Sequence, residues 1–548
     1  MALKSIKSRY SFIEDFPLRR ILTLVFLASP FVIYITFVAK FGVNIPFWDE
    51  WDFTGLVIAY YNHTLTFPML WAQHNENRML VPEIIYITVQ LLTHYHNKVI
   101  MYLDAGILAT AVYAMIWFLG RYIHRTLWLL PIPYILFSLI QNENTLWAFQ
   151  TAWYLVLLAL VGGTIVLALD CRWAVLIAVV LGILASLSSV QGLLIWPSLA
   201  PFFLHRTKTD RLQWLVAGFF TIGVYLLGFN FGISGGPGYL YALTHPVIAL
   251  KYFFVACSGI FAISNNSPGG YFEAGVLGIV LFGAAVYSLF LWWRHPRDIL
   301  LQSTAAWILF ALFFDLLLVI GRSGFGIPQA LSSRYTTYNL LLLVAVYVTF
   351  VRAYLIEKHP QPKYALALGV VGLLMVIQVS AGTRIGLLQG YGTFQNRIQA
   401  ADLVVNYETS SAHFPALITQ YVFPDVPVVL QDSAWLAEHR LNVFSEPQAN
   451  MYRSWGVLPG GTPGPLLTIP SAFRHYLLTN PFAYRAWVTL STIYDGRSDL
   501  QAAFGSGSGF DAKLLQWATT SGVTIDGDAP YLIPYKAQLF QMYHLLKS

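Results

Sequence analysis

Eleven long apolar segments constrain this chain more than any other feature of its sequence. Segments of about 20 apolar residues have the length that a helix needs to cross the hydrocarbon core of a bilayer. They lie near residues 21–40, 100–119, 127–141, 151–170, 173–189, 192–204, 213–232, 274–293, 299–320, 337–356 and 364–381. Charged residues make up only 11% of the chain, against about 25% in soluble domains. The sequence therefore predicts a mainly α fold, a polytopic bundle of transmembrane helices.

A twelfth apolar stretch, Val247–Ser264, contains Lys251 and lies between two loops that are rich in glycine and proline. Counting this stretch as a span would invert the later loops and move Arg294, Arg297 and Lys358 to the outer side. We therefore expect it to be re-entrant or interfacial.

The distribution of basic residues orients the bundle. In the eleven-span arrangement, 16 lysines and arginines face one side, which the positive-inside rule makes cytoplasmic. They are Lys4, Lys7, Arg9, Arg19, Arg20, Arg121, Arg125, Arg172, Arg206, Lys208, Arg211, Arg294, Arg297, Arg352, Lys358 and Lys363. Six face the other side: Lys40, Arg78, Lys98, Lys251, Arg322 and Arg334. The formal net charge is +6, but the basic residues form no dense stretch, so no nucleic-acid partner is expected.

This orientation predicts two domains. Residues 1–381 form a transmembrane core with a cytoplasmic N-terminus and an extracytoplasmic loop at 41–99. Residues 382–548 form a small extracytoplasmic soluble domain, since they have shorter apolar runs and many turn residues. The two cysteines, Cys171 and Cys257, are too few for a disulfide framework and are expected to be buried thiols.

An acidic motif follows the first span. Asp49, Glu50 and Asp52 lie next to Trp48 and Trp51 at the expected outer surface. Carboxylates beside a bilayer repel one another and are costly unless water, a cation or a substrate meets them. The motif suits a base or a metal site. A solvated loop with tryptophans at the membrane interface is the alternative.

A run of six polar residues, 73–78, lies in the same outer loop. His74, Asn75, Glu76 and Arg78 offer donors, an acid and a guanidinium, which together can hold sugar hydroxyls or a phosphate. The alternative is a polar turn between two interfacial helices.

The short outer loop 141–150 combines amides, a carboxylate and aromatic rings. Asn142, Glu143, Asn144 and Gln150 are its polar candidates. Amides beside aromatic rings commonly bind sugars, through hydrogen bonds and ring stacking. An interfacial aromatic belt would explain the same composition.

The last outer loop, 321–335, contains Arg322, Arg334 and Tyr335. Arginines are unusual on this side, and their guanidinium groups pair bidentately with phosphate. Ordinary snorkelling arginines are the alternative. In the preceding apolar run, Asp315 is an intramembrane acid that either has a function or pairs with a neighbouring helix.

These features together resemble the GT-C superfamily of membrane glycosyltransferases, which use sugars linked to polyprenyl phosphate. The resemblance rests on the multi-span core over about the first 380 residues, the acidic motif after the first span and the outer C-terminal domain. It implies that Asp49 is the catalytic base or helps to bind a metal, with Glu50 and Asp52 as alternatives. It also implies a lipid-linked sugar donor, a glycan, lipid or protein acceptor, a possible divalent cation and a place in the bacterial inner membrane.

The expected reaction transfers a glycosyl group from a lipid phosphate to an acceptor hydroxyl. A carboxylate would accept the hydroxyl proton, while Arg322 and Arg334 would stabilise the charge on the leaving phosphate. The chain lacks the glycine-rich loop of nucleotide-sugar transferases, which favours a lipid-linked donor. The alternative is a transporter or flippase of lipid-linked saccharides, which would need polar groups near the bilayer midplane.

Overall fold

A computed structural model of the chain describes residues 17–231, 238–261, 268–356, 361–413, 415–445, 476, 483, 486–487, 490, 498–504, 510–520 and 535–547. It is about 83% helical, which confirms the mainly α fold. The contacts divide the chain into two compact units. The first unit comprises Met1–Val43, Ala59–Thr93 and Asn97–Phe394, and the second comprises Asn44–Ile58, His94–His96 and Gln395–Ser548. Lys4, Lys7, Arg9, Lys358 and the end of the twelfth apolar stretch lie outside the described residues.

Seven helices of the described residues are long and apolar enough to cross a membrane. These are α2 (Pro17–Phe41), α6 (Asn97–Gly120), α9 (Thr151–Leu169), α16 (Pro268–Arg294), α17 (Ile299–Arg322), α18 (Thr336–Ile356) and α19 (Pro362–Val405). Each coincides with one of the eleven expected spans. The chain is a multi-pass membrane protein.

The other four expected spans fall on shorter or less apolar helices. The segment at 127–141 is divided among η1 (Thr126–Trp128), α7 (Pro131–Leu136) and η2 (Leu139–Gln141). The two that follow α9 are α10 (Ala174–Ser186) and the series η4 (Val190–Leu194), α11 (Ile195–Ser198) and α12 (Ala200–Phe203). The fourth is α13 (Lys208–Leu226), whose first turn is charged. The 13 residues of α10 rise by only about 20 Å, against about 30 Å for the hydrocarbon core.

The twelfth stretch forms α15 (Pro246–Cys257) and η5 (Gly259–Phe261). With 12 residues, α15 is too short for a straight crossing. It packs against α16 and α17. A side chain at Gly278 of α16 would collide with the carbonyl of Phe254 in α15, so glycine permits this close approach.

Apart from Asn44–Ile58 and His94–His96, the predicted outer loops form short elements within the first unit. The loop after α2 contains α4 (Phe67–Leu70), β1 (Gln73–His74), β2 (Asn77–Arg78) and α5 (Leu80–Leu92). The two later loops contain α8 (Asn142–Leu146), η3 (Ala148–Gln150), η6 (Ser323–Phe325), η7 (Ile327–Leu331) and η8 (Ser333–Tyr335). A further short helix, α14 (Tyr241–Thr244), precedes α15.

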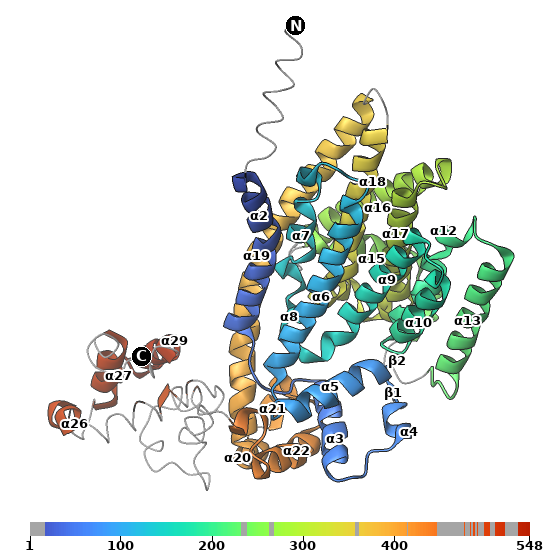
Figure 1. The fold of residues 1–548 in the computed structure, drawn as a ribbon. Helices are drawn as coiled ribbons and strands as arrows, with labels where there is room; N and C mark the ends of the chain where they lie inside the picture. Colours follow the sequence, from blue (N-terminus) through green and yellow to red (C-terminus); the bar gives the residue numbers. More distant parts are fainter. Residues whose placement is uncertain are drawn as a thin grey trace. The chain divides into compact units, whose positions relative to one another are not determined.

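Helices α17 and α18 pack against each other in the first unit, and most of their residues are buried (Figure 1). Asp298 caps α17 by accepting a hydrogen bond from the Leu301 amide at 3.1 Å. The same carboxylate pairs with Arg352 of α18, whose Nε and Nη2 lie 2.9 and 2.7 Å from it. Helices α2 and α19 lie side by side, with Phe41 against Phe394. The expected span at 364–381 is thus the first part of a longer helix.

The second unit is also helical where it is described. It contains most of α3 (Glu50–Tyr61), together with α20 (Tyr407–His413), α21 (Pro415–Tyr421), α22 (Val426–Glu438), η9 (Asn442–Ser445), α26 (Ser498–Phe504), α27 (Phe510–Thr520) and α29 (Lys536–Lys547). Asn442 donates hydrogen bonds to the side chain of Asn44 at 2.9 Å and to the carbonyl of Tyr95 at 3.0 Å. The acidic motif therefore belongs to the same unit as the tail.

The prediction of two buried thiols is half wrong. Cys257 is buried, but Cys171 is exposed. Cys171 follows Asp170, which ends α9 in the left-handed conformation, so it lies in the turn between α9 and α10.

Candidate functional site

The β1–β2 hairpin presents the first group of predicted binding residues. Its strands are antiparallel, with Gln73 opposite Arg78 and His74 opposite Asn77. Asn75 in the turn has a φ of 50°, which asparagine tolerates better than most residues. Its amide lies 3.2 Å from Nε2 of His74.

Glu76, the other residue of this turn, forms an ion pair with Arg322 at the end of α17. The side chains of Glu76 and Arg322 are 22% and 25% exposed. The second carboxylate oxygen of Glu76 is buried without a hydrogen-bond partner among the described residues. The Arg322 guanidinium lies 5.7 Å from the centre of the Phe325 ring. The pair joins two motifs that are 246 residues apart in the sequence.

Arg78 holds the hairpin in place. Its Nε donates to the carbonyl of Tyr225 at 2.8 Å, and its Nη2 donates to the carbonyl of Leu227 at 2.6 Å. A third hydrogen bond runs from Nη1 to the carbonyl of Trp71. Burial lowers the pKa of Arg78. These bonds connect the hairpin to the end of α13 and occupy much of the donor capacity of the guanidinium.

The outer loops at residues 141–150 and 321–335 are hydrogen-bonded to each other. One carboxylate oxygen of Glu143 accepts from the Ser332 hydroxyl and from the Arg334 amide, both at 2.9 Å. The Glu143 amide donates to the Ser333 hydroxyl at 3.1 Å, and Asn144 donates to the Arg334 carbonyl at 2.8 Å. Glu143 and Asn144 therefore fix the backbone on which Arg334 is carried.

The hairpin (residues 73–78) also contacts the loop at residues 141–150. The ring of His74 lies 5.1 Å from that of Phe149 in η3. Gln150, the next residue, is buried at the start of α9. Asn142 donates to Oε1 of Gln389 in α19 at 2.6 Å.

Arg334 and Tyr335 lie together in η8. The Arg334 guanidinium is 5.4 Å from the centre of the Tyr335 ring. The Tyr335 hydroxyl accepts a hydrogen bond from Gln329 at 3.2 Å, and its ring lies 6.2 Å from that of Trp153. The aromatic contacts leave the arginine backed by rings, an arrangement that suits recognition of a planar or anionic group.

The structure thus brings the three outer motifs together in the first unit. We call this set the outer polar cluster: His74, Asn75, Glu76, Arg78, Asn142, Glu143, Asn144, Gln150, Arg322, Arg334 and Tyr335. The Asn75 amide is exposed and can hydrogen-bond a hydroxyl group, whereas Asn142, Asn144 and Gln150 are at most 3% exposed. The two arginines of the 321–335 loop can bind an anion. Several of these groups also hold the cluster's own backbone, which keeps the site rigid.

The three acids of the acidic motif, Asp49, Glu50 and Asp52, belong to the second unit. Glu50 is 1% exposed and accepts a hydrogen bond from the Phe47 amide at 3.1 Å, so it stabilises the loop itself. Asp49 is half-buried and Asp52 is exposed. The Arg397 guanidinium lies 3.0 Å from the centre of the Phe47 ring.

Asp432 of α22, also in the second unit, is an acid that the sequence reasoning missed. It is buried, and burial, followed by repulsion from Asp52, raises its pKa to about 7. The available signal was a single aspartate within the apolar pattern of α22. The exposed carboxyl of Asp52 and the buried carboxyl of Asp432 are therefore close enough to interact.

Glu83 was also missed, in the first unit. It is 4% exposed, and burial raises its pKa to about 8 while His74 acts in the opposite direction. It is the one acid in the apolar helix α5, which is a signal that the sequence offers. Glu83 places a protonated carboxyl near the hairpin at neutral pH.

No group of three or more histidine, cysteine, aspartate or glutamate residues that could hold a metal ion occurs within the described ranges. No family model, curated protein or solved structure matches the chain.

Proposed function

We propose that this protein is an integral membrane glycosyltransferase. It would move a sugar from a polyprenyl-phosphate-linked donor to an acceptor hydroxyl of a glycan, lipid or protein on the extracytoplasmic side. The observation that carries the proposal is the outer polar cluster, in which arginines, amides and aromatic rings from three distant loops meet in a multi-pass membrane protein. This inventory suits a ligand with both an anionic phosphate and sugar hydroxyls.

The donor phosphate is assigned to Arg322 and Arg334. The backbone of Arg334 is fixed by Glu143 and Asn144, so its guanidinium can be aimed without a large loss of conformational freedom. Arg322 is paired with Glu76, and a phosphate would compete with that carboxylate. This competition favours release of the product phosphate after transfer, because the Glu76 carboxylate can form its ion pair with Arg322 again.

The acceptor is assigned to the acidic motif. A carboxylate takes the proton of the acceptor hydroxyl as its oxygen attacks the anomeric carbon of the donor. The bond between that carbon and the phosphate oxygen breaks, and the electron pair leaves with the lipid phosphate. Asp49 is preferred by resemblance to the GT-C superfamily. The hydrogen bond from Phe47 to Glu50 supports this choice over Glu50.

The test is transfer of sugar from lipid-linked donors by the purified protein. Asp49→Asn keeps the shape but removes the proton acceptor, so turnover should fall by about 10²- to 10⁴-fold while donor binding survives. Glu50→Gln and Asp52→Asn show which acid carries the role. Glu438→Gln, at an exposed acid of the same unit, is the matched control. Wild-type rates in all three acid variants would remove the catalytic assignment.

A transporter or flippase of lipid-linked saccharides is the second candidate. A polar group inside the bundle favours it: Asp315 of α17 is buried and accepts hydrogen bonds from Asn339 at 3.0 Å and Cys257 at 3.1 Å. In proteoliposomes, movement of a fluorescent lipid-linked saccharide that is abolished by Asp315→Asn, without any sugar transfer, would favour this candidate.

A further inference from the structure

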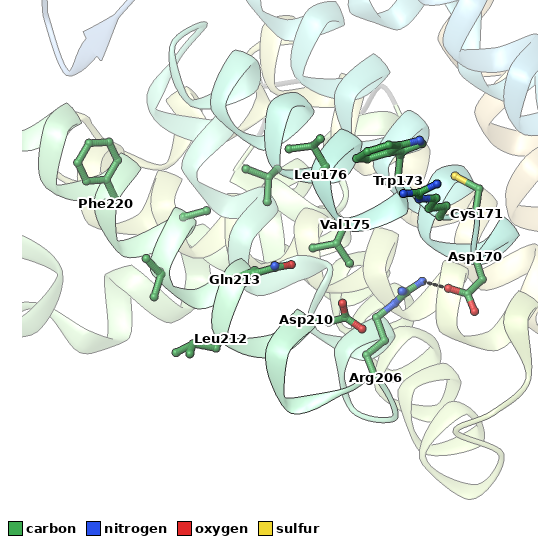
Figure 2. Close-up of a pocket in the computed structure, with 14 residues that line it drawn as sticks. Asp170, Cys171, Trp173, Val175, Leu176, Arg206, Asp210, Leu212, Gln213 and Phe220 are labelled. Atoms are coloured by element: carbon green, nitrogen blue, oxygen red, sulfur yellow. Dashed lines mark ion pairs between the residues drawn. The ribbon is translucent and has the colours of Figure 1, made fainter.

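A pocket away from the outer polar cluster lies between α10 and α13. Its volume is about 970 Å³, at the upper end of the usual range of about 300–1,000 Å³ for small-molecule sites. Figure 2 shows a polar end, with Asp170, Arg206 and Asp210, and an apolar side that extends to Phe220. By the expected topology, the polar end faces the cytoplasmic side of the membrane.

The apolar side is exposed, as a lipid contact requires. Leu176 of α10 is 55% exposed, and Leu212, Val216 and Phe220 of α13 are 62%, 58% and 70% exposed. In water such a surface would be costly, but in a bilayer it meets acyl chains. The pocket therefore offers a groove in which an acyl chain can lie along two helices.

One ion pair at the polar end is internal to the protein. Arg206 contacts Asp170 at 2.8 Å (Figure 2). Arg206 also donates to the carbonyl of Leu167 at 2.9 Å. This pair ties the end of α9 to the segment before α13, and its charges cancel.

Two further charges at this end make no ion pair with any residue in the described part of the chain. Arg172 is exposed, with its guanidinium 5.1 Å from the centre of the Trp173 ring. Asp210 lies in the first turn of α13, where its amide donates to the Thr207 hydroxyl at 3.1 Å. The pocket thus presents one cation and one anion, which complement a headgroup that carries a phosphate and an ammonium.

We propose that this pocket binds a phospholipid with a zwitterionic phosphoethanolamine headgroup. Arg172 pairs with the phosphate, Asp210 accepts hydrogen bonds from the primary ammonium, and one acyl chain lies along the groove between α10 and α13. An anionic headgroup without an ammonium would face the Asp210 carboxylate uncompensated, so phosphatidylglycerol should be a poor ligand.

The test uses native mass spectrometry of the purified full chain, incubated with equal amounts of dioleoyl phosphatidylethanolamine and dioleoyl phosphatidylglycerol. The wild type should retain phosphatidylethanolamine about tenfold more than phosphatidylglycerol, because one charge-assisted contact separates the two. Asp210→Asn should abolish this preference. Arg172→Gln should lower the retention of both lipids about tenfold, and Arg125→Gln, an exposed arginine outside the pocket, should behave as the wild type.

A groove-filling variant shows that the lipid occupies this pocket. Ala217 lines the groove, so Ala217→Phe should reduce retention of phosphatidylethanolamine while the protein remains monodisperse. If the wild type retains phosphatidylglycerol equally well or better, the headgroup assignment is wrong. If Asp210→Asn and Arg172→Gln both leave retention unchanged, the site is wrong.

Discussion

Replacing Glu76 by glutamine is expected to strengthen binding of a lipid phosphate, the opposite of what loss of a polar contact usually does. Glu76 occupies Arg322, which the proposed donor phosphate must share or capture. Glutamine has nearly the same size but no charge. The variant therefore removes the competitor and keeps the arginine.

The magnitude follows from the geometry of the ion pair. Two unit charges about 4 Å apart interact by about 4 kcal/mol at an effective dielectric constant of about 20. The two side chains are 22% and 25% exposed, so solvent screening lowers this attraction to about 1–2 kcal/mol. Binding of the phosphate should tighten about 5- to 30-fold.

The assay is equilibrium binding of a short polyprenyl monophosphate to the purified protein at fixed ionic strength. Arg322→Gln should weaken binding, and the gain from Glu76→Gln should vanish in the double variant, because the two residues act on one contact. Asp298→Asn is the control, because it breaks an ion pair with Arg352 that lies outside the outer polar cluster. This variant should leave the affinity for the polyprenyl phosphate unchanged. Weaker binding in Glu76→Gln, equal to that in Arg322→Gln, would refute the competition and make the pair purely structural.

Three further predictions concern the tail, the second arginine and the buried acid of α22. In intact cells, a membrane-impermeant maleimide should label Glu438→Cys in a Cys171→Ser background, whereas native Cys171 should label only after permeabilisation; the reverse pattern would overturn the topology. Arg334→Ala should weaken binding of the polyprenyl phosphate more than it lowers the folded yield, and Arg334→Lys should restore it only in part, because an ammonium lacks the fork geometry; unchanged affinity in both would end that assignment. The folded-state pKa of Asp432, about 7, exceeds the unfolded value of about 3.9, so folded protein binds more protons and its stability falls as pH rises from about 4 to 7. Asp432→Asn should therefore raise the thermal midpoint relative to wild type more at pH 8 than at pH 4, and an equal effect at both would show that the carboxyl is not held protonated.

Sequence patterns were sufficient for the membrane character because span formation is local. Each of the seven long helices is an apolar run that satisfies its own backbone hydrogen bonds, so its hydropathy predicts it without reference to the rest of the chain. The same reasoning was weaker for α7 and α10, which it counted as spans. There, proline or insufficient length interrupts the run, and packing against neighbours decides where the helix ends.

For the candidate site too, the sequence predicted some features and only the structure showed others. Residue type and position alone singled out Arg322, Arg334 and the acidic motif, because arginines are unusual on the outer side and clustered carboxylates beside a bilayer are costly. The sequence could not pair Glu76 with Arg322, 246 residues away, or Asn44 with Asn442, 398 residues away. Such pairs depend on how helices pack, and hydropathy carries no information about that. Only the tertiary structure joined three polar loops into one cluster in the first unit and placed the acidic motif with the tail in the second, because both outcomes arise from side-chain contacts between distant segments.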